Sequence, residues 1–136
     1  MHPKRRVIAA SVKEPRAGLW SNCVVVGNIA YVSGMTARGP DPEVILGEDE
    51  YAQAKVIFQK IRDLVEAAGG QMNDIVKMTV YVTRIAHNTE VWRARQEFFS
   101  GDFPACTLVE VAALAKPAIL LEIEAIAHLG CSAARP

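Results

Sequence analysis

The sequence lacks the features that direct a chain to nucleic acid, to a membrane or out of the cell. Its fifteen basic and fifteen acidic side chains cancel, which excludes the strongly positive character of proteins that bind phosphate backbones or anionic lipids. No apolar run approaches the length of a membrane span. The N-terminal segment resembles a signal peptide for only a few residues, because Lys13, Glu14 and Pro15 interrupt its apolar part. We therefore expect a cytoplasmic protein without a nucleic-acid or membrane partner.

Cysteine and histidine are also scarce. The three cysteines, Cys23, Cys106 and Cys131, are odd in number, show no CxxC spacing and have no histidine at a metal-ligand separation. They are expected to be free thiols in a reducing compartment. The sequence thus predicts no metal site, and nothing in it requires an organic cofactor.

What is present suffices for one domain. With 136 residues, of which 51% are hydrophobic, the chain can bury one core, and we expect residues 1–136 to form a single domain. Its clearest local element is a hairpin. Two β-branched and aromatic runs, 23–26 and 29–33, are separated only by Gly27-Asn28, which is typical of a two-residue hairpin turn.

Two helices and four further strands are predicted around this hairpin. The segment 49–68 places its apolar residues on one stripe and ends at Gly69-Gly70, as an amphipathic helix does. Before it, the glycine- and proline-rich loop 35–47 is unusually long, and such a loop is either functional or a solvated excursion. The other expected elements are a first strand at 6–10, a strand at 75–83 with Val76, Met78, Val80 and Val82 toward the core, a helix at 88–100, and a closing hairpin within 104–128.

The closing hairpin carries the polar residues of greatest interest. Apolar and polar residues alternate in its two strands, and the apolar sides of both strands are expected to face one core. This places Cys106, Glu110, Glu122 and Glu124 on the opposite surface. The element order favours an α+β fold, a mixed sheet with both helices on one face. Tyrosines, a lysine and carboxylates share the other face, and this mixture suits a subunit interface lined with pockets. We therefore expect a homo-oligomer.

Six segments spread over nearly the whole chain carry a family resemblance. They are VGNIAYVSGM at 26–35, EAAGG at 66–70, DIVKMTVYV at 74–82, EFF at 97–99, FPACTLVEVAAL at 103–114 and EIEAIA at 122–127. On these segments the chain resembles the RidA/YjgF family, many of whose members hydrolyse reactive imines and enamines to ketoacids and ammonia. The resemblance implies a chorismate-mutase-like fold with a mixed six-strand sheet, a homotrimer whose sheets form a central barrel, and small-molecule sites in the clefts between subunits.

The resemblance also indicates site residues, and it shows where this chain departs from the family. Ser33-Gly34 and Glu122 are kept, the latter at the position of the glutamate that the family uses to place water. Cys106 stands where deaminating members have an arginine that holds the substrate carboxylate. Trp20 stands where a tyrosine usually borders the cleft, and Trp92 where the second helix has an asparagine.

The cysteine changes the expected ligand. A bidentate contact between a guanidinium and a carboxylate contributes about 1.5–3 kcal/mol, and a thiol cannot replace it. A cleft that has lost this contact and gained indole surface is expected to take a ligand larger and less acidic than a two- or three-carbon imino acid. Arg16, Arg38 and Arg95 are the candidates for a replacement cation, and the sequence does not choose among them.

Each candidate residue has a structural alternative. Glu122 is either a water-positioning base whose pKa is raised by burial or an interface residue paired across the trimer. Cys106 is either a nucleophile, which needs a neighbouring cation or helix N-terminus, or a small apolar filler, which we favour. The two tryptophans either stack on a planar ligand or are buried at an interface. Ser33 either donates to the ligand or caps the turn at Gly34.

Two functions of different classes follow. The first is a hydrolase that adds water to an imine or enamine carbon, in which Glu122 orients the water. Backbone amides near Cys106 and Thr107 hold the developing charge, and Ala105 and Thr107 are expected substrate contacts. The second is a non-catalytic trimer that binds a metabolite or a protein partner in the same clefts. Ribonuclease activity is disfavoured, because the sequence offers no basic groove and no paired histidines.

Overall fold

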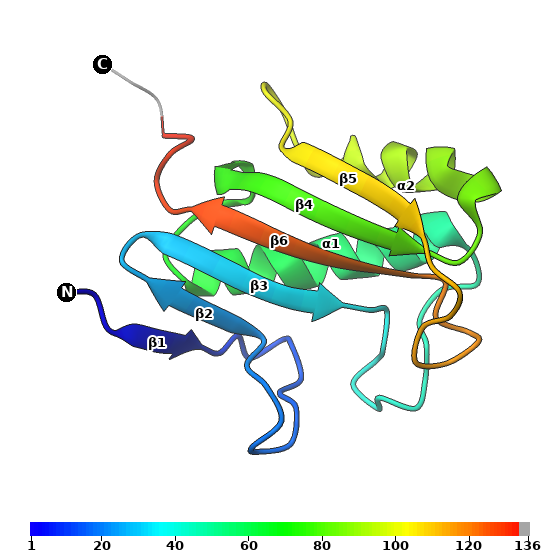
Figure 1. Ribbon diagram of the computed structural model, residues 1–136, viewed down its shortest axis with the longest axis horizontal. Coiled ribbons are helices and arrows are strands. Elements are labelled where there is room, and N and C mark those ends of the chain that lie inside the picture. The colour runs from blue at the N-terminus through cyan, green and yellow to red at the C-terminus, as the bar shows by residue number, and fades with distance from the viewer. Residues whose placement is uncertain (134–136) are drawn as a thin grey trace.

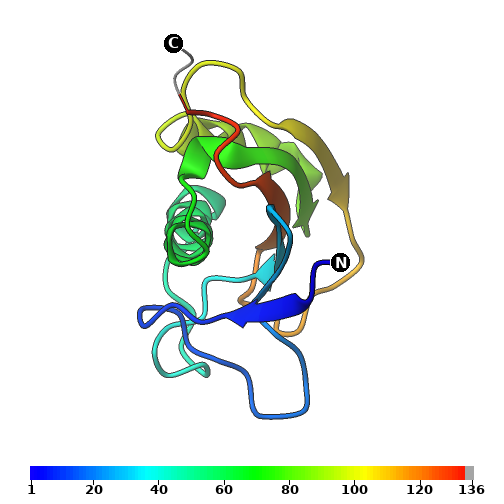
Figure 2. The ribbon, with the colours of Figure 1, turned by 90° about the vertical axis from the view of Figure 1, so that its left-hand side faces the viewer.

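A computed structural model of the chain describes residues 1–133 and has the α+β architecture expected from the sequence. Six strands form one mixed sheet in the order β1-β2-β3-β6-β4-β5, and both helices lie on one face of it (Figure 1, Figure 2). The strands are β1 (Lys4–Val7), β2 (Cys23–Val26), β3 (Ile29–Met35), β4 (Ile75–Val82), β5 (Ala105–Glu110) and β6 (Leu121–His128). The helices are α1 (Glu50–Ala67) and α2 (Asn88–Arg95), with short 3-10 turns at Met72–Asp74 and Ile85–His87.

Helix α1 and the β2–β3 hairpin form as predicted. The Asp49 side chain accepts a hydrogen bond from the Ala52 amide and caps α1, and Gly69, at φ 101°, reverses the chain after it. Its apolar stripe is fully buried against the sheet and supplies much of the core. Gln53, also buried, donates to the Gly47 and Ala118 carbonyls and accepts from the Leu120 amide, so it fastens the start of α1 to the start of β6.

Helix α2 ends at Arg95, five residues before the predicted end. After it, the Phe98 amide donates to the Arg95 carbonyl three residues back, a turn tighter than an α-helix. This turn brings the rings of Phe98 and Phe99 against Phe58 on α1, with centroids 5.4 and 6.1 Å away. The two phenylalanines therefore pack on α1 although the backbone that carries them is not α-helical.

The closing hairpin was wrongly predicted, because β5 and β6 do not pair. Strand β4 lies between them, antiparallel to β6 and parallel to β5. A strand that returns after a helical crossover runs parallel to the strand it left, and α2 is that crossover. Strand β6 then enters between β3 and β4, in the middle of the sheet (Figure 1).

The faces of β5 also differ from the prediction. Cys106 and Leu108 stand beside Met78 and Val80, which are fully buried, so they face the core rather than the open surface. Glu110 stands beside buried Val82 and accepts a hydrogen bond from the Ile85 amide. The edge strand is apolar on both sides, so alternation did not define its core face. For β6 the prediction is confirmed, because the carboxylates lie opposite the buried alternate residues Leu121, Ile123, Ala125 and Ala127.

Strands β1 and β4 each differ from the prediction in one respect. Strand β1 covers residues 4–7 instead of 6–10. In β4, a register shift between Ile75 and Lys77 leaves Val76 38% exposed and buries Ile75 in its place. Within residues 1–133, neither helix combines the length and apolar composition that crossing a bilayer requires.

Candidate functional site

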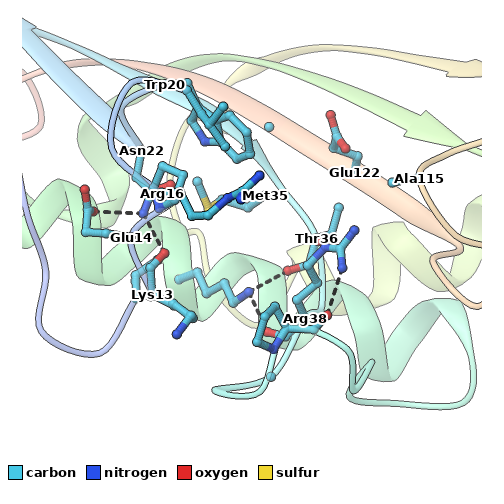
Figure 3. A pocket seen from close by; sticks show the side chains of 17 residues that line it. Lys13, Glu14, Arg16, Trp20, Asn22, Met35, Thr36, Arg38, Ala115 and Glu122 are labelled. Atoms are coloured by element: carbon cyan, nitrogen blue, oxygen red, sulfur yellow. Dashed lines mark hydrogen bonds between the residues drawn. The ribbon is translucent and has the colours of Figure 1, made fainter.

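A cavity of about 450 Å³ lies beside the middle of the sheet (Figure 3). Its walls come from parts of the chain that are distant in sequence, among them Lys60 of α1. The loop between β1 and β2 contributes Trp20, the segment after β3 contributes Arg38, and β6 contributes Glu122. The cavity therefore exists only because β6 pairs with β3.

A bulge at the end of β3 forms the floor of the site. Between Val32 and Met35 the pairing with β6 shifts, so that Ser33-Gly34 carries an extra residue relative to the partner strand. The Glu122 side chain lies directly over Gly34. A Cβ atom at Gly34 would be 2.3 Å from Oε2 of Glu122 and 2.8 Å from its Cδ. A glycine is thus required here by the close approach of the carboxylate.

Glu122 is a half-buried carboxylate to which no group of residues 1–133 donates a hydrogen bond. Burial raises the pKa of Glu122, the neighbouring Glu124 raises it further, and Arg38 opposes this effect. A carboxyl group with a raised pKa exchanges protons closer to neutral pH, as a general acid or base must. Glu124, by contrast, accepts the hydroxyl of Tyr81 and has a structural partner.

The long loop 35–47, which the sequence left as either functional or solvated, forms an ordered wall of the cavity. Its backbone is closed by hydrogen bonds from the Gly39 amide to the Val44 carbonyl and from the Leu46 amide to the Ala37 carbonyl, each 2.7 Å. Lys60 on α1 donates to the carbonyls of Thr36 and Arg38, also at 2.7 Å. Burial and the nearby Arg38 lower the pKa of Lys60.

Lys60 lies on the polar side of α1, opposite the apolar stripe, yet it does not extend freely into solvent. Its side chain is half-buried and fastens the loop to α1. Helical periodicity could not reveal this, since it gives the direction of a side chain but not the carbonyl groups that a distant loop brings to it.

Trp20 and Leu19 supply the apolar wall. More than half of each side chain is exposed, Trp20 at 57% and Leu19 at 53%. Their loop is held by Ser33, whose hydroxyl donates to the Ser21 carbonyl at 2.6 Å and whose amide donates to the Asn22 carbonyl. Ser33 therefore lies behind the cavity wall, and its hydroxyl proton is already engaged.

The remaining predicted site residues lie elsewhere. Ala105, Cys106 and Thr107 are on β5 and Trp92 is on α2, and none of these lines the cavity within one chain. The Thr107 hydroxyl accepts a hydrogen bond from Lys77 at 3.0 Å. The sequence-predicted residues are thus divided between the cavity, the edge strand β5 and helix α2.

Of the three candidate cations, Arg16 and Arg38 line the cavity and Arg95 does not. Arg16 belongs to the exposed β1–β2 loop, whereas Arg38 is half-buried and donates to the Pro42 carbonyl at 2.8 Å. Arg95 lies on α2 with its Nε buried. In the part of the chain described, no three histidine, cysteine or acidic side chains come together as metal ligands would.

Comparisons with known proteins point in one direction. The family model described as Endoribonuclease L-PSP matches residues 12–129. A RutC family protein of Pyrococcus abyssi is 34% identical over 111 residues, which cover 82% of this chain and 87% of that protein. A solved Pseudomonas aeruginosa protein of unknown function has a TM-score of 0.86 at 44% identity, over 96% of this chain and 95% of that one. RidA from the Antarctic bacterium Psychrobacter sp. has a TM-score of 0.79 at 35% identity, over 92% of this chain and 100% of that one.

Proposed function

The chain belongs to the RidA/YjgF (endoribonuclease L-PSP) family, and we propose that it is a hydrolase that converts an imine or enamine-like metabolite to a carbonyl compound and ammonia. The observation that carries this proposal is the carboxylate of Glu122, which lies over Gly34 in the cavity wall with a raised pKa and no hydrogen-bond donor within residues 1–133. The proposed reaction uses water and side chains alone.

The chemistry assigned to Glu122 is a proton transfer in each direction. The ionised carboxylate takes a proton from water while the water oxygen bonds to the imine carbon, and the C=N double bond becomes a single bond. The protonated carboxyl group returns that proton to the nitrogen, which gives a carbinolamine. The carboxylate then transfers the hydroxyl proton of the carbinolamine to the nitrogen, the C–N bond breaks, ammonia leaves and the carbonyl remains. A pKa nearer neutrality favours both steps, because the group must accept and release a proton in each turnover.

We further propose that the active form is a cytoplasmic homotrimer. The open face of the sheet, which no helix covers, carries Val24, Tyr31 and Ile126 side by side in three adjacent strands, and Tyr31 is 46% exposed. An uncovered apolar row of this kind supports a subunit interface. Light scattering coupled to gel filtration tests the trimer, and a monomeric mass would contradict it.

The hydrolase proposal is tested with an imine made in the assay. Threonine dehydratase acting on L-threonine generates 2-iminobutanoate, and 2-ketobutanoate release is followed with and without the protein. We expect acceleration by the wild type, loss in Glu122→Gln and retention in Glu110→Gln, a matched change of a carboxylate outside the cavity. If the wild type gives no acceleration but Cys106→Arg does, 2-iminobutanoate is excluded as the substrate, while the fold is shown to be capable of imine hydrolysis.

The exposed Trp20 and Leu19 favour one alternative, a non-catalytic trimer that binds a planar metabolite or a partner in the same cavity. Thermal-shift screening with planar acids and amides distinguishes the two functions. Stabilisation by such ligands without turnover of any imine would favour the binding protein. Turnover that depends on Glu122 would exclude it.

A further inference from the structure

Arg38 is a half-buried cation that lines the Glu122 cavity with most of its hydrogen-bond donors unused. Only Nη1 has a partner within residues 1–133, the Pro42 carbonyl, and no carboxylate of that part of the chain forms an ion pair with it. A guanidinium presents its N–H groups as a planar fork. In Figure 3, Arg38 lies on the same side of the cavity as Glu122.

The position of Arg38 is fixed by its backbone. Its carbonyl accepts a hydrogen bond from Lys60, and the residue forms an isolated antiparallel bridge with Ile45. The neighbouring Ala37 and Gly39 are tied across the same loop. A cation held in this way loses less conformational freedom on binding than one on a mobile loop.

The surroundings of Arg38 favour an anion. Lys13, Arg16 and Lys60 also line the cavity, against Glu14 and Glu122 as the acidic groups. The Glu14 carboxylate is already bound by Arg6 and by the Asn22 amide. A second cavity of about 840 Å³ shares Lys13, Arg38 and Lys60 with the first and adds Lys55 and Asp63, so basic side chains outnumber acidic ones there as well.

We propose that Arg38 is the group that binds the carboxylate of the ligand, and that it selects carboxylate-bearing ligands with an apolar portion that packs on Trp20. The part of this inference that concerns substrates rests on the proposed hydrolase function, whereas the selection of a carboxylate does not. The assignment of Arg38 also replaces the expectation of a less acidic ligand that was based on Cys106, because the loop 35–47 supplies the cation.

A pair of ligands with the same shape tests the carboxylate contact without catalysis. Binding of 3-phenylpropanoate and 3-phenylpropanamide is measured by calorimetry. We expect the wild type to bind the acid about ten- to a hundredfold more tightly than the amide. Arg38→Gln should abolish this preference, and Arg38→Lys should keep part of it, because an ammonium keeps the charge but not the fork.

Two further arginine variants locate the effect. Arg62→Gln removes a cation that stacks on Phe98 away from the cavity, and Arg16→Gln removes the exposed cation of the same cavity. Arg62→Gln should retain the full preference for the acid, and Arg16→Gln should reduce it much less than Arg38→Gln does. Thermal melting of every variant confirms that it is folded.

A matched pair of imines extends the test to substrates. An L-amino-acid oxidase acting on phenylalanine gives 2-imino-3-phenylpropanoate, and an amine oxidase acting on phenethylamine gives the same imine without the carboxylate; catalase removes the peroxide in both. The wild type should accelerate ammonia release from the first more than from the second. Arg38→Gln should lower kcat/KM for the carboxylated imine about tenfold or more beyond any change in kcat/KM for the neutral imine.

The outcomes separate the two proposals. Equal binding of acid and amide by the wild type, or a preference lost in Arg16→Gln but kept in Arg38→Gln, overturns the assignment of Arg38. If binding depends on Arg38 but no imine is hydrolysed, the hydrolase proposal fails and the assignment stands. If imines are hydrolysed and Arg38→Gln is indistinguishable from the wild type, the hydrolase proposal stands and the assignment of Arg38 fails.

Discussion

Two carboxylates of this molecule, Asp74 and Glu122, lie in opposite electrostatic conditions. Asp74 is 1% exposed, and its oxygens accept hydrogen bonds from the amides of Gln71, Gly130 and Ser132 and from the Ser132 hydroxyl. Glu122 is half-buried and accepts none within residues 1–133. Burial alone would raise the pKa of Asp74, but its hydrogen bonds lower it, whereas burial raises the pKa of Glu122.

The difference indicates how a structural and a functional carboxylate are distinguished in one fold. Buried polar groups of native proteins are normally satisfied, and Asp74 follows this rule by joining the 3-10 turn before β4 to the chain after β6. A carboxylate beside a cavity that accepts no hydrogen bonds from the protein can accept them from a ligand or from water. The comparison gives four predictions, in order of decreasing effect.

Removal of the Asp74 carboxylate should give the largest loss of stability. Asp74→Ala leaves the donors before β4 and after β6 that bind this carboxylate without a partner. We expect the free energy of unfolding to fall by about 3 kcal/mol. Urea denaturation at neutral pH measures this. Asp63→Ala removes a half-buried carboxylate whose hydrogen bonds from Ser11 and Gln59 are exposed to solvent, and it should cost about 1 kcal/mol or less. Equal losses in the two variants would remove the structural role given to Asp74.

Glu122→Gln should have the opposite profile. We expect kcat/KM for imine hydrolysis to fall about 100-fold or more, since a general base of this kind contributes at least that much. The melting temperature at neutral pH should not fall, and should rise slightly, because the amide needs no charge in a half-buried site. A destabilised variant with unchanged activity would place Glu122 among the structural carboxylates.

Gly34→Ala should disturb the site through a single methyl group. The new Cβ would overlap the Glu122 carboxylate at 2.3 Å, so the side chain must rotate away, and we expect an activity loss of about tenfold. Gly39→Ala provides the control, because its Cβ would meet Leu46 and the Val44 carbonyl at 3.4 Å, an ordinary contact. Retained activity in Gly34→Ala would show that the carboxylate position over Gly34 is not needed.

The smallest effect is on the pH dependence of stability, and it has opposite signs for the two residues. The pKa of Asp74 is lowered from its ordinary 3.8, so its stabilisation is present above that pH and is lost as the pH falls through the lowered value. The pKa of Glu122 is raised from 4.5, so its contribution is fully present below 4.5 and is lost as the pH rises through the raised value.

Urea unfolding over an acidic to neutral pH series measures both signs. The stability difference between wild type and Asp74→Asn should shrink as the pH falls below 3.8. The difference between Glu122→Gln and wild type should grow as the pH rises above 4.5. If the two differences changed in the same direction, the contrast between the carboxylates would be wrong.

Local elements were predictable where a few neighbouring residues decide them. The hairpin follows from Gly27-Asn28 between β-branched runs, and α1 follows from its Asp49 cap, apolar stripe and terminal glycines. The pairing of strand β5 was not predictable in this way, because its parallel pairing with β4 depends on where α2 returns the chain. An edge strand that is apolar on both sides also gives no pattern from which to choose its core face.

The sequence by itself indicated the family, the α+β class, and Glu122 and Gly34 as candidate site residues. Only the tertiary structure decided which residues share the cavity with them. Arg38 and Lys60 lie together because Lys60 donates to carbonyls 22 and 24 residues away in the chain. Cys106 does not line the cavity of its own chain, because β4 separates β5 from β6. Periodicity records which side of an element is apolar, whereas the position of a charge relative to a cavity depends on long-range pairing that no local pattern contains.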